Sequence, residues 1–204
     1  GTIPIDSGDI GVNGTSIVGT KDFLRHRSIG RVYQDPSKGT CPSMTILENL
    51  SLADNKGKPY NLGKGINKAK IEQYKELLKK LNLGLEDKLY TQVGSLSGGQ
   101  RQALALLMST MTPIEFLILD EHTAALDPKT ADLIMELTDQ IVKEKKVTTI
   151  MVTHNLRYAV EYGNRLIMMH QGEAIIDKSG EDKRALSTED IMSTFNRISV
   201  ECGN

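Results

Sequence analysis

The pentapeptide LSGGQ occupies Leu96–Gln100, and a helix-forming run, Arg101–Met108, follows it directly. Because glycine carries no Cβ, the backbone at Gly98 and Gly99 can approach a ligand closely. Ser97 adds a hydroxyl group, and the N-terminus of the following helix presents free N–H groups at the positive end of the helix dipole. The stretch therefore predicts a phosphate-binding turn, although a Ser-Gly-Gly turn that only caps a helix would have the same sequence.

Bulk composition excludes several classes of protein. The 204 residues suffice for one domain, or for one domain with a sizeable insertion. A net charge of −1, 4% aromatic residues and no Trp argue against a nucleic-acid-binding surface. Cys41 and Cys202 form no CxxC motif, which suits a reducing cytosol and predicts no metal or disulfide framework. Since no apolar run is long enough to span a membrane, any membrane association would come through a partner.

The first half of the chain combines short strands with a helical block. Alternation over Gly8–Gly14 predicts a strand that enters a tight Asn-Gly turn, and Ile29–Tyr33 predicts a second strand. From Met44 onward the apolar spacing becomes helical, and Lys68–Leu83 is amphipathic. Between these helices, Asn55–Gly65 is rich in Gly, Asn and Lys and is expected to be an exposed loop.

After the LSGGQ helix, strands and helices alternate. Strands are expected at Glu115–Asp120 and Val147–Thr153, helices at Lys129–Lys143 and Leu156–Tyr162, a hairpin over Arg165–Asp177, and a last helix from Ser187. Such alternation predicts an α/β fold with a parallel sheet and right-handed crossovers. The block Met44–Met111 interrupts it and is interpreted as an inserted helical subdomain.

The chemistry concentrates where the apolar strand at Phe116–Leu119 runs into Asp120 and Glu121. Ligands of open α/β sheets bind beyond the carboxyl ends of the strands. A carboxylate there can hold Mg²⁺, and a second can orient or deprotonate a water molecule. A strand that happens to run into an acidic turn would have the same pattern.

Further polar residues follow other predicted elements. Asp127 precedes a helix that begins with proline, and His154 follows the strand Val147–Thr153. A histidine at this sheet edge could contact a phosphate or a water molecule, although many strand-end histidines are structural. Gln34 ends the strand Ile29–Tyr33, where its amide could contact a metal or a water molecule.

Taken together, these motifs occur in the order found in the nucleotide-binding domains of ABC transporters, and the chain resembles that family from Gly1 to about Asp177. The matching residues are the Q-loop glutamine Gln34, the signature motif Leu96–Gln100, the Walker B aspartate Asp120, the catalytic glutamate Glu121, the D-loop Ala124–Asp127 and the switch histidine His154.

This resemblance implies a P-loop NTPase-like (RecA-like) α/β fold and a Mg²⁺-dependent ATPase. It implies catalytic roles for Glu121, His154 and Gln34, and metal binding by Asp120 and Gln34. The nucleotide would be contacted by Ser97, Gly98, Gly99, Gln100 and Asp127. It also implies a head-to-tail dimer with a second nucleotide-binding subunit, in which the signature motif of one subunit faces the γ-phosphate held by the other.

The resemblance further implies a cytoplasmic subunit, peripheral on the inner face of the membrane. It would dock transmembrane permease subunits through Gln34–Glu48 and act indirectly with an extracytoplasmic solute-binding protein. Within one ABC domain, residues 1–43 would carry the Q-loop, residues 44–111 the helical subdomain, and residues 112–204 the rest of the ATPase core.

Two departures from the family pattern stand out. No GxxxxGK[ST] motif occurs, so the strand and loop that cradle the β- and γ-phosphates are expected upstream of Gly1, and the 204-residue chain is expected to be inactive alone. His122 stands where many relatives place proline or a small residue. It could make an extra contact to phosphate or water, but the expectation is a loop variant at an exposed turn without a role.

The phrases Gly30–Pro36 and Leu119–Ala131 look similar to a subgroup of bacterial importer ATPases linked to tryptophan/tyrosine-type binding proteins. The function expected is thus the ATPase subunit of an importer of amino acids or similar small solutes. Two alternatives stay open, namely a non-catalytic ABC remnant that only pairs with another subunit, and an ABC protein without a transporter.

Overall fold

A computed structural model describes residues 3–59 and 65–201 of the chain. These residues belong to two compact units, Gly1–Val152 and Thr153–Asn204, a boundary that the sequence analysis did not predict. The expected loop Asn55–Gly65 lies partly outside the described residues, as does Cys202. No helix among the residues described is long and apolar enough to cross a membrane.

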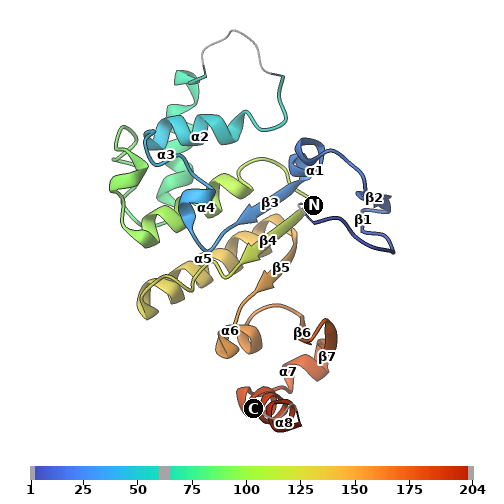
Figure 1. Cartoon of the computed structure of the whole chain (residues 1–204). Helices are drawn as coiled ribbons and strands as arrows, with labels where there is room; N and C mark the ends of the chain where they lie inside the picture. Colours follow the sequence, from blue (N-terminus) through green and yellow to red (C-terminus); the bar gives the residue numbers. More distant parts are fainter. Residues whose placement is uncertain (1–2, 60–64, 202–204) are drawn as a thin grey trace. The chain divides into compact units, whose positions relative to one another are not determined.

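A three-stranded parallel sheet forms the centre of the first unit (Figure 1). Its strands are β3 (Ile29–Val32), β4 (Phe116–Asp120) and β5 (Thr148–Val152), in that order. Pairing of β3 with β4 joins segments more than 80 residues apart, as the inserted helical block requires. The predicted α/β fold with a parallel sheet is confirmed.

The two faces of this sheet differ in burial. Leu117 and Leu119 of β4 are buried in one apolar cluster with residues of α4 (Gly98–Thr110) and α5 (Pro128–Lys145). Side chains alternate between the two faces of a strand, so the residues on either side of Leu117 and Leu119 point to the opposite face of the sheet. On β5, Ile150 and Val152 belong to this opposite face, and they are 54% and 50% exposed.

The described part of the helical block contains α2 (Ile46–Asp54), α3 (Ile71–Lys79), α4 and two short 3₁₀ turns, Lys68–Lys70 and Val93–Ser95. Thr45 and Glu48 form a capping box at the start of α2. Tyr74 and Leu78 of α3 are buried, as their helical spacing indicates. The helix ends before the expected Leu83 because Asn82 and Gly84 adopt left-handed backbone angles, with φ of 53° and 64°.

Two elements precede β3. Strands β1 (Gly11–Val12) and β2 (Thr15–Ser16) form a hairpin whose turn residues, Asn13 and Gly14, both have positive φ, as the Asn-Gly pair predicts. Helix α1 (Asp22–Ser28) was not predicted from the sequence. It buries none of its residues, so it lacks the apolar stripe by which a helix is recognised.

Within its described residues, 153–201, the second unit contains an antiparallel hairpin and three helices. Its elements are α6 (Leu156–Glu161), β6 (Arg165–His170), β7 (Glu173–Ser179), α7 (Gly180–Arg184) and α8 (Thr188–Glu201). The expected hairpin and the Ser187–Asp190 cap of the last helix are confirmed, since Ser187 Oγ accepts from the Asp190 N–H at 3.2 Å. Lys183 of α7 donates to the carbonyl of Tyr162 at 3.0 Å, just beyond the end of α6.

Candidate functional site

The LSGGQ motif forms the N-terminus of α4. Ser97 is the N-cap, and its hydroxyl accepts from the Gln100 N–H at 3.2 Å. In return, Gln100 Oε1 accepts from the Ser97 N–H at 3.2 Å, which completes a capping box. Gln100 Nε2 also donates to the carbonyl of Leu83 at 3.2 Å. The motif therefore does cap a helix, which the sequence left open as an alternative, and the Gln100 side chain takes part in the cap.

Tight packing against α5 explains why glycine is found at position 99. A Cβ at Gly99 would overlap Thr130 Cγ2 of α5, whereas a Cβ at Gly98 would lie 3.4 Å from Leu126 Cδ2, an ordinary contact. A larger residue at position 99 would thus force Thr130 of α5 to shift. Gly98 has no such restriction, and it lines the cleft described next.

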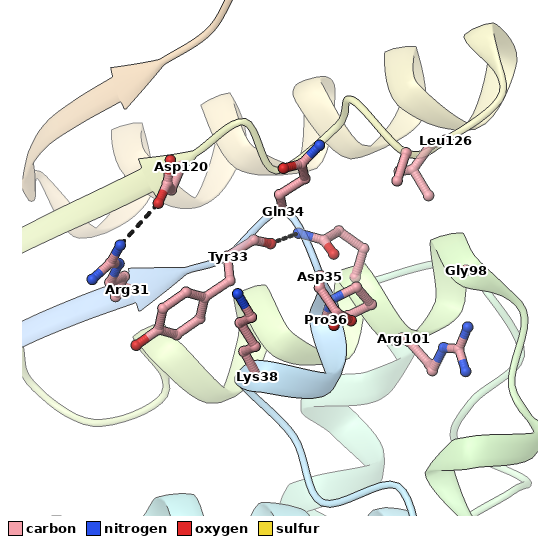
Figure 2. Close-up of a pocket in the computed structure, with 12 residues that line it drawn as sticks. Arg31, Tyr33, Gln34, Asp35, Pro36, Lys38, Gly98, Arg101, Asp120 and Leu126 are labelled. Carbon is pink, nitrogen blue, oxygen red and sulfur yellow. Dashed lines mark hydrogen bonds and ion pairs between the residues drawn. The ribbon is translucent and has the colours of Figure 1, made fainter.

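An open cleft of about 550 Å³ lies at the carboxyl ends of β3 and β4 (Figure 2). It brings together three residues predicted from separate parts of the sequence, namely Gln34, Gly98 and Asp120. Lys38 and Arg101 also line it and bring positive charge, which suits an anionic ligand. This is the position at which open α/β sheets bind their ligands.

Asp120 is held by a cation that the sequence analysis missed. Arg31 Nη2 donates to Asp120 Oδ2 at 2.8 Å, and the Arg31 guanidinium lies over the Tyr33 ring, 4.5 Å from its centroid (Figure 2). Both partners of the ion pair are partly exposed to the cleft. The sequence indicated this ion pair only by the presence of one charged residue, Arg31, within the otherwise apolar strand β3.

Helix α4 supports the segment that carries Gln34. Gln102 is buried, and its Nε2 donates to the carbonyl of Tyr33 at 3.0 Å. Asp35, which follows Gln34, accepts from the Ser37 N–H at 2.9 Å, and this hydrogen bond holds the pKa of Asp35 below its ordinary value. The contribution of Gln102 depends on tertiary contact and has no signal in the local sequence.

Glu121 occupies a tight turn directly after β4. Its φ of 46° is left-handed, which is unfavourable for a residue other than glycine. Its N–H donates to the carbonyl of Val152 at 2.9 Å, and its carbonyl accepts from the Ala124 N–H at 3.0 Å. Strained backbone of this kind persists where the surrounding structure holds it, often at functional sites.

The expectation that His122 lies at an exposed turn is wrong. The side chain is 2% exposed, and its Nε2 lies 3.1 Å from Thr138 Oγ1 of α5. Burial lowers the pKa of His122 from 6.5 to about 4, because a charged ring would lose its hydration. The turn after Glu121 folds inward onto α5, which the local sequence does not reveal.

Asp127 caps α5, and its side chain accepts from the Thr130 N–H at 3.1 Å. Hydrogen bonds from Thr130 hold the pKa of Asp127 below its ordinary value. Two preceding residues of the predicted D-loop, Ala125 and Leu126, line the cleft.

His154 belongs to the second unit. It follows β5 by two residues and precedes Asn155, whose side chain accepts from the Tyr158 N–H at 3.3 Å and so caps α6.

The donor set of the cleft fits Mg²⁺. Among residues 3–59 and 65–201, no three His, Cys, Asp or Glu residues cluster as a complete protein-made metal site. Mg²⁺ instead binds through one or two carboxylates and keeps its remaining positions for water and substrate phosphates. Asp120 and Gln34 line the same cleft and would supply oxygen ligands of this kind.

Comparison with known proteins agrees with this site. The sequence profile of the family described as "ABC transporter" matches residues 1–124. A tyrosine transport ATP-binding protein of Clostridioides difficile is 50% identical over 195 residues, which cover 96% of this chain and 77% of that protein. A probable ABC transporter ATP-binding protein of Campylobacter jejuni is 36% identical over 68% of this chain, which spans only 54% of that relative.

Solved structures support the same assignment. A dimeric ATP-binding cassette in a post-hydrolysis state, bound to ADP and Pi, aligns with a TM-score of 0.70 and 26% identity, over 87% of this chain and 75% of the other. The family expected from the motifs is thus confirmed. The chain belongs to the ABC transporter family.

Proposed function

We propose that the chain acts in the ATP-hydrolysing subunit of an importer for tyrosine or a related aromatic amino acid. The observation that carries the ATPase assignment is the cleft in which Gln34, Gly98 and Asp120 meet. The cargo is suggested by the 50% identity to a tyrosine transport ATP-binding protein.

In this proposal the residues of the cleft serve two nucleotides: Asp120 and Gln34 act on the nucleotide of this subunit, and the signature motif acts on the nucleotide of a second subunit. Asp120 and Gln34 would hold Mg²⁺, which when bound neutralises phosphate charge. Ser97, Gly98 and Gly99 would present the N-terminus of α4 to the γ-phosphate held by a second subunit. Gln100 supports this turn through its hydrogen bonds to Ser97 and Leu83.

Hydrolysis requires a water molecule in line with the γ-phosphate. Glu121 would orient this water and accept its proton. His154 would contact the γ-phosphate, and Asp127 would act at the dimer interface. The support for Glu121 is its place in a strained turn directly after Asp120, beside the cleft.

The assembly proposed is a head-to-tail dimer with a second nucleotide-binding subunit, docked on transmembrane permease subunits. Residues Gln34–Glu48 would contact the permease, and a solute-binding protein would deliver cargo from outside. The chain would thus lie peripherally on the cytoplasmic face of the membrane, without a nucleic-acid partner. Within the ABC domain we assign the Q-loop to residues 1–43, the helical subdomain to 44–111 and the remaining core to 112–204.

Deletion of the gene and its complementation test this proposal. Uptake of radiolabelled tyrosine is expected to fall on deletion and to return with the unmodified gene. Glu121→Gln should restore protein level but not uptake, whereas Glu136→Gln, at an exposed position on α5, should restore both. Unchanged tyrosine uptake after deletion would refute the cargo. Full uptake with Glu121→Gln would refute its role as the base.

A further inference from the structure

The buried pair His122–Thr138 joins the turn after β4 to α5. His122 directly follows Glu121 and is only 2% exposed. Its Nε2 lies 3.1 Å from Thr138 Oγ1. The two residues are 16 positions apart, so the contact ties two different elements together.

The hydrogen bonds of Thr138 determine which ring nitrogen carries the proton. A threonine hydroxyl has one proton to donate. Thr138 Oγ1 lies 2.7 Å from the carbonyl oxygen of Ile134, which can only accept, so the hydroxyl proton is used there. The hydroxyl must therefore accept from His122. The neutral ring is consequently protonated at Nε2 and not at Nδ1.

This hydrogen bond attaches to α5 the residue that directly follows Glu121, whose backbone conformation is unfavourable. Glu121 has a left-handed φ of 46°, and backbone hydrogen bonds of its N–H to Val152 and of its carbonyl to Ala124 help to hold the turn. An unfavourable backbone conformation persists only where its surroundings hold it. The Nε2–H of His122 adds a side-chain attachment of this turn to α5.

We propose that His122 is a positioning residue, which holds the Glu121 turn in place by donating its Nε2–H to Thr138. Its relevance to hydrolysis rests on the role proposed above for Glu121. The same helix contacts the LSGGQ motif, since Gly99 packs against Thr130 of α5. Helix α5 is thus the common support of the signature motif and of the Glu121 turn.

The first test uses the unmodified chain. A long-range ¹H–¹⁵N correlation spectrum at pH 8, with His122 assigned through a His122→Gln variant, should show a proton on Nε2 and none on Nδ1. A proton on Nδ1 would overturn the proposal, because the ring could then not donate to Thr138. This measurement needs no nucleotide, and the variant serves only to assign the signal.

The second test is amide hydrogen exchange at Glu121 and Ala124. Thr138→Val keeps the shape of the side chain but removes the acceptor, and exchange should become about fivefold faster at both amides after normalisation to global stability. Thr110→Val is the matched control, because Thr110 is buried like Thr138 and its hydroxyl donates to carbonyls of its own helix, α4. Equal effects of the two variants would overturn the proposal.

A conservative variant separates positioning from packing. His122→Gln retains an N–H donor and should keep exchange at Glu121 slow, whereas His122→Met should accelerate it as Thr138→Val does. Equal exchange in the Gln and Met variants would count against the hydrogen bond. All of these readouts are taken without nucleotide, so they are independent of the outcome of Glu121→Gln in the uptake experiment.

Discussion

The burial of His122 predicts a measurable dependence of stability on pH. In the folded state its pKa is lowered from 6.5 to about 4, because burial disfavours the charged ring. Between these values the unfolded chain binds a proton at His122 that the folded chain does not. The folded state therefore has its full stability above pH 6.5 and loses stability as the pH falls toward 4.

The magnitude follows from the two pKa values. Since one pKa unit corresponds to about 1.36 kcal/mol, lowering the pH from 8 to 5 should cost the folded chain about 2 kcal/mol through His122 alone. This is a substantial part of the stability of an ordinary domain, which is about 5–15 kcal/mol.

Urea unfolding, followed by circular dichroism between pH 8 and pH 5, measures the effect. The comparison is with His122→Gln, which keeps a donor for Thr138 but does not titrate. Other groups titrate in both proteins and cancel in the difference. The free energy of unfolding of the unmodified chain should fall about 2 kcal/mol further than that of the variant. Parallel pH profiles would refute the argument from burial.

Two further predictions concern packing, and urea unfolding tests both. Gly99→Ala should destabilise the chain by about 1–3 kcal/mol because the new Cβ overlaps Thr130, although alanine is the better helix former. Gly98→Ala is the control, and a Gly99→Ala variant that is more stable than the unmodified chain would disprove the close approach. Leu117→Ala, at a fully buried position, should lower the free energy of unfolding by about 2–5 kcal/mol. Ile150→Ala, at a position that is 54% exposed, should lower it by about 1 kcal/mol or less. Equal losses of stability would contradict the difference in burial between the two sheet faces.

Most elements could be predicted because their signals are local. The short apolar runs within Glu115–Asp120 and Val147–Thr153 predicted β4 and β5, and the apolar spacing of Lys68–Leu83 predicted α3. The errors occurred where the local signal was weak. Helix α1 has no buried face, and α3 ends early because two residues after it are left-handed.

The candidate site was predictable in part. Gln34, Gly98 and Asp120 were recognised from motifs in separate segments, and the structure places them along one cleft. Arg31 and Gln102 were missed, because each acts through a partner that is distant in the chain. His122 was assigned to the surface, since nothing in its immediate sequence shows that the turn folds onto α5.

The sequence by itself determined the family, the order of strands and helices, and the identity of the chemical groups. These follow from residue type and from short-range spacing, which are the same in any arrangement of the elements. LSGGQ and the strand that ends in Asp120 and Glu121 needed no structure to be recognised.

Only the tertiary structure decided which of these groups meet. Arg31 bonds Asp120 across 89 positions because β3 and β4 pair in one particular register. His122 reaches Thr138, and Gly99 packs on Thr130, because α5 presents one face to both segments. Strand register and helix orientation are set by packing over the whole unit, which no single segment encodes.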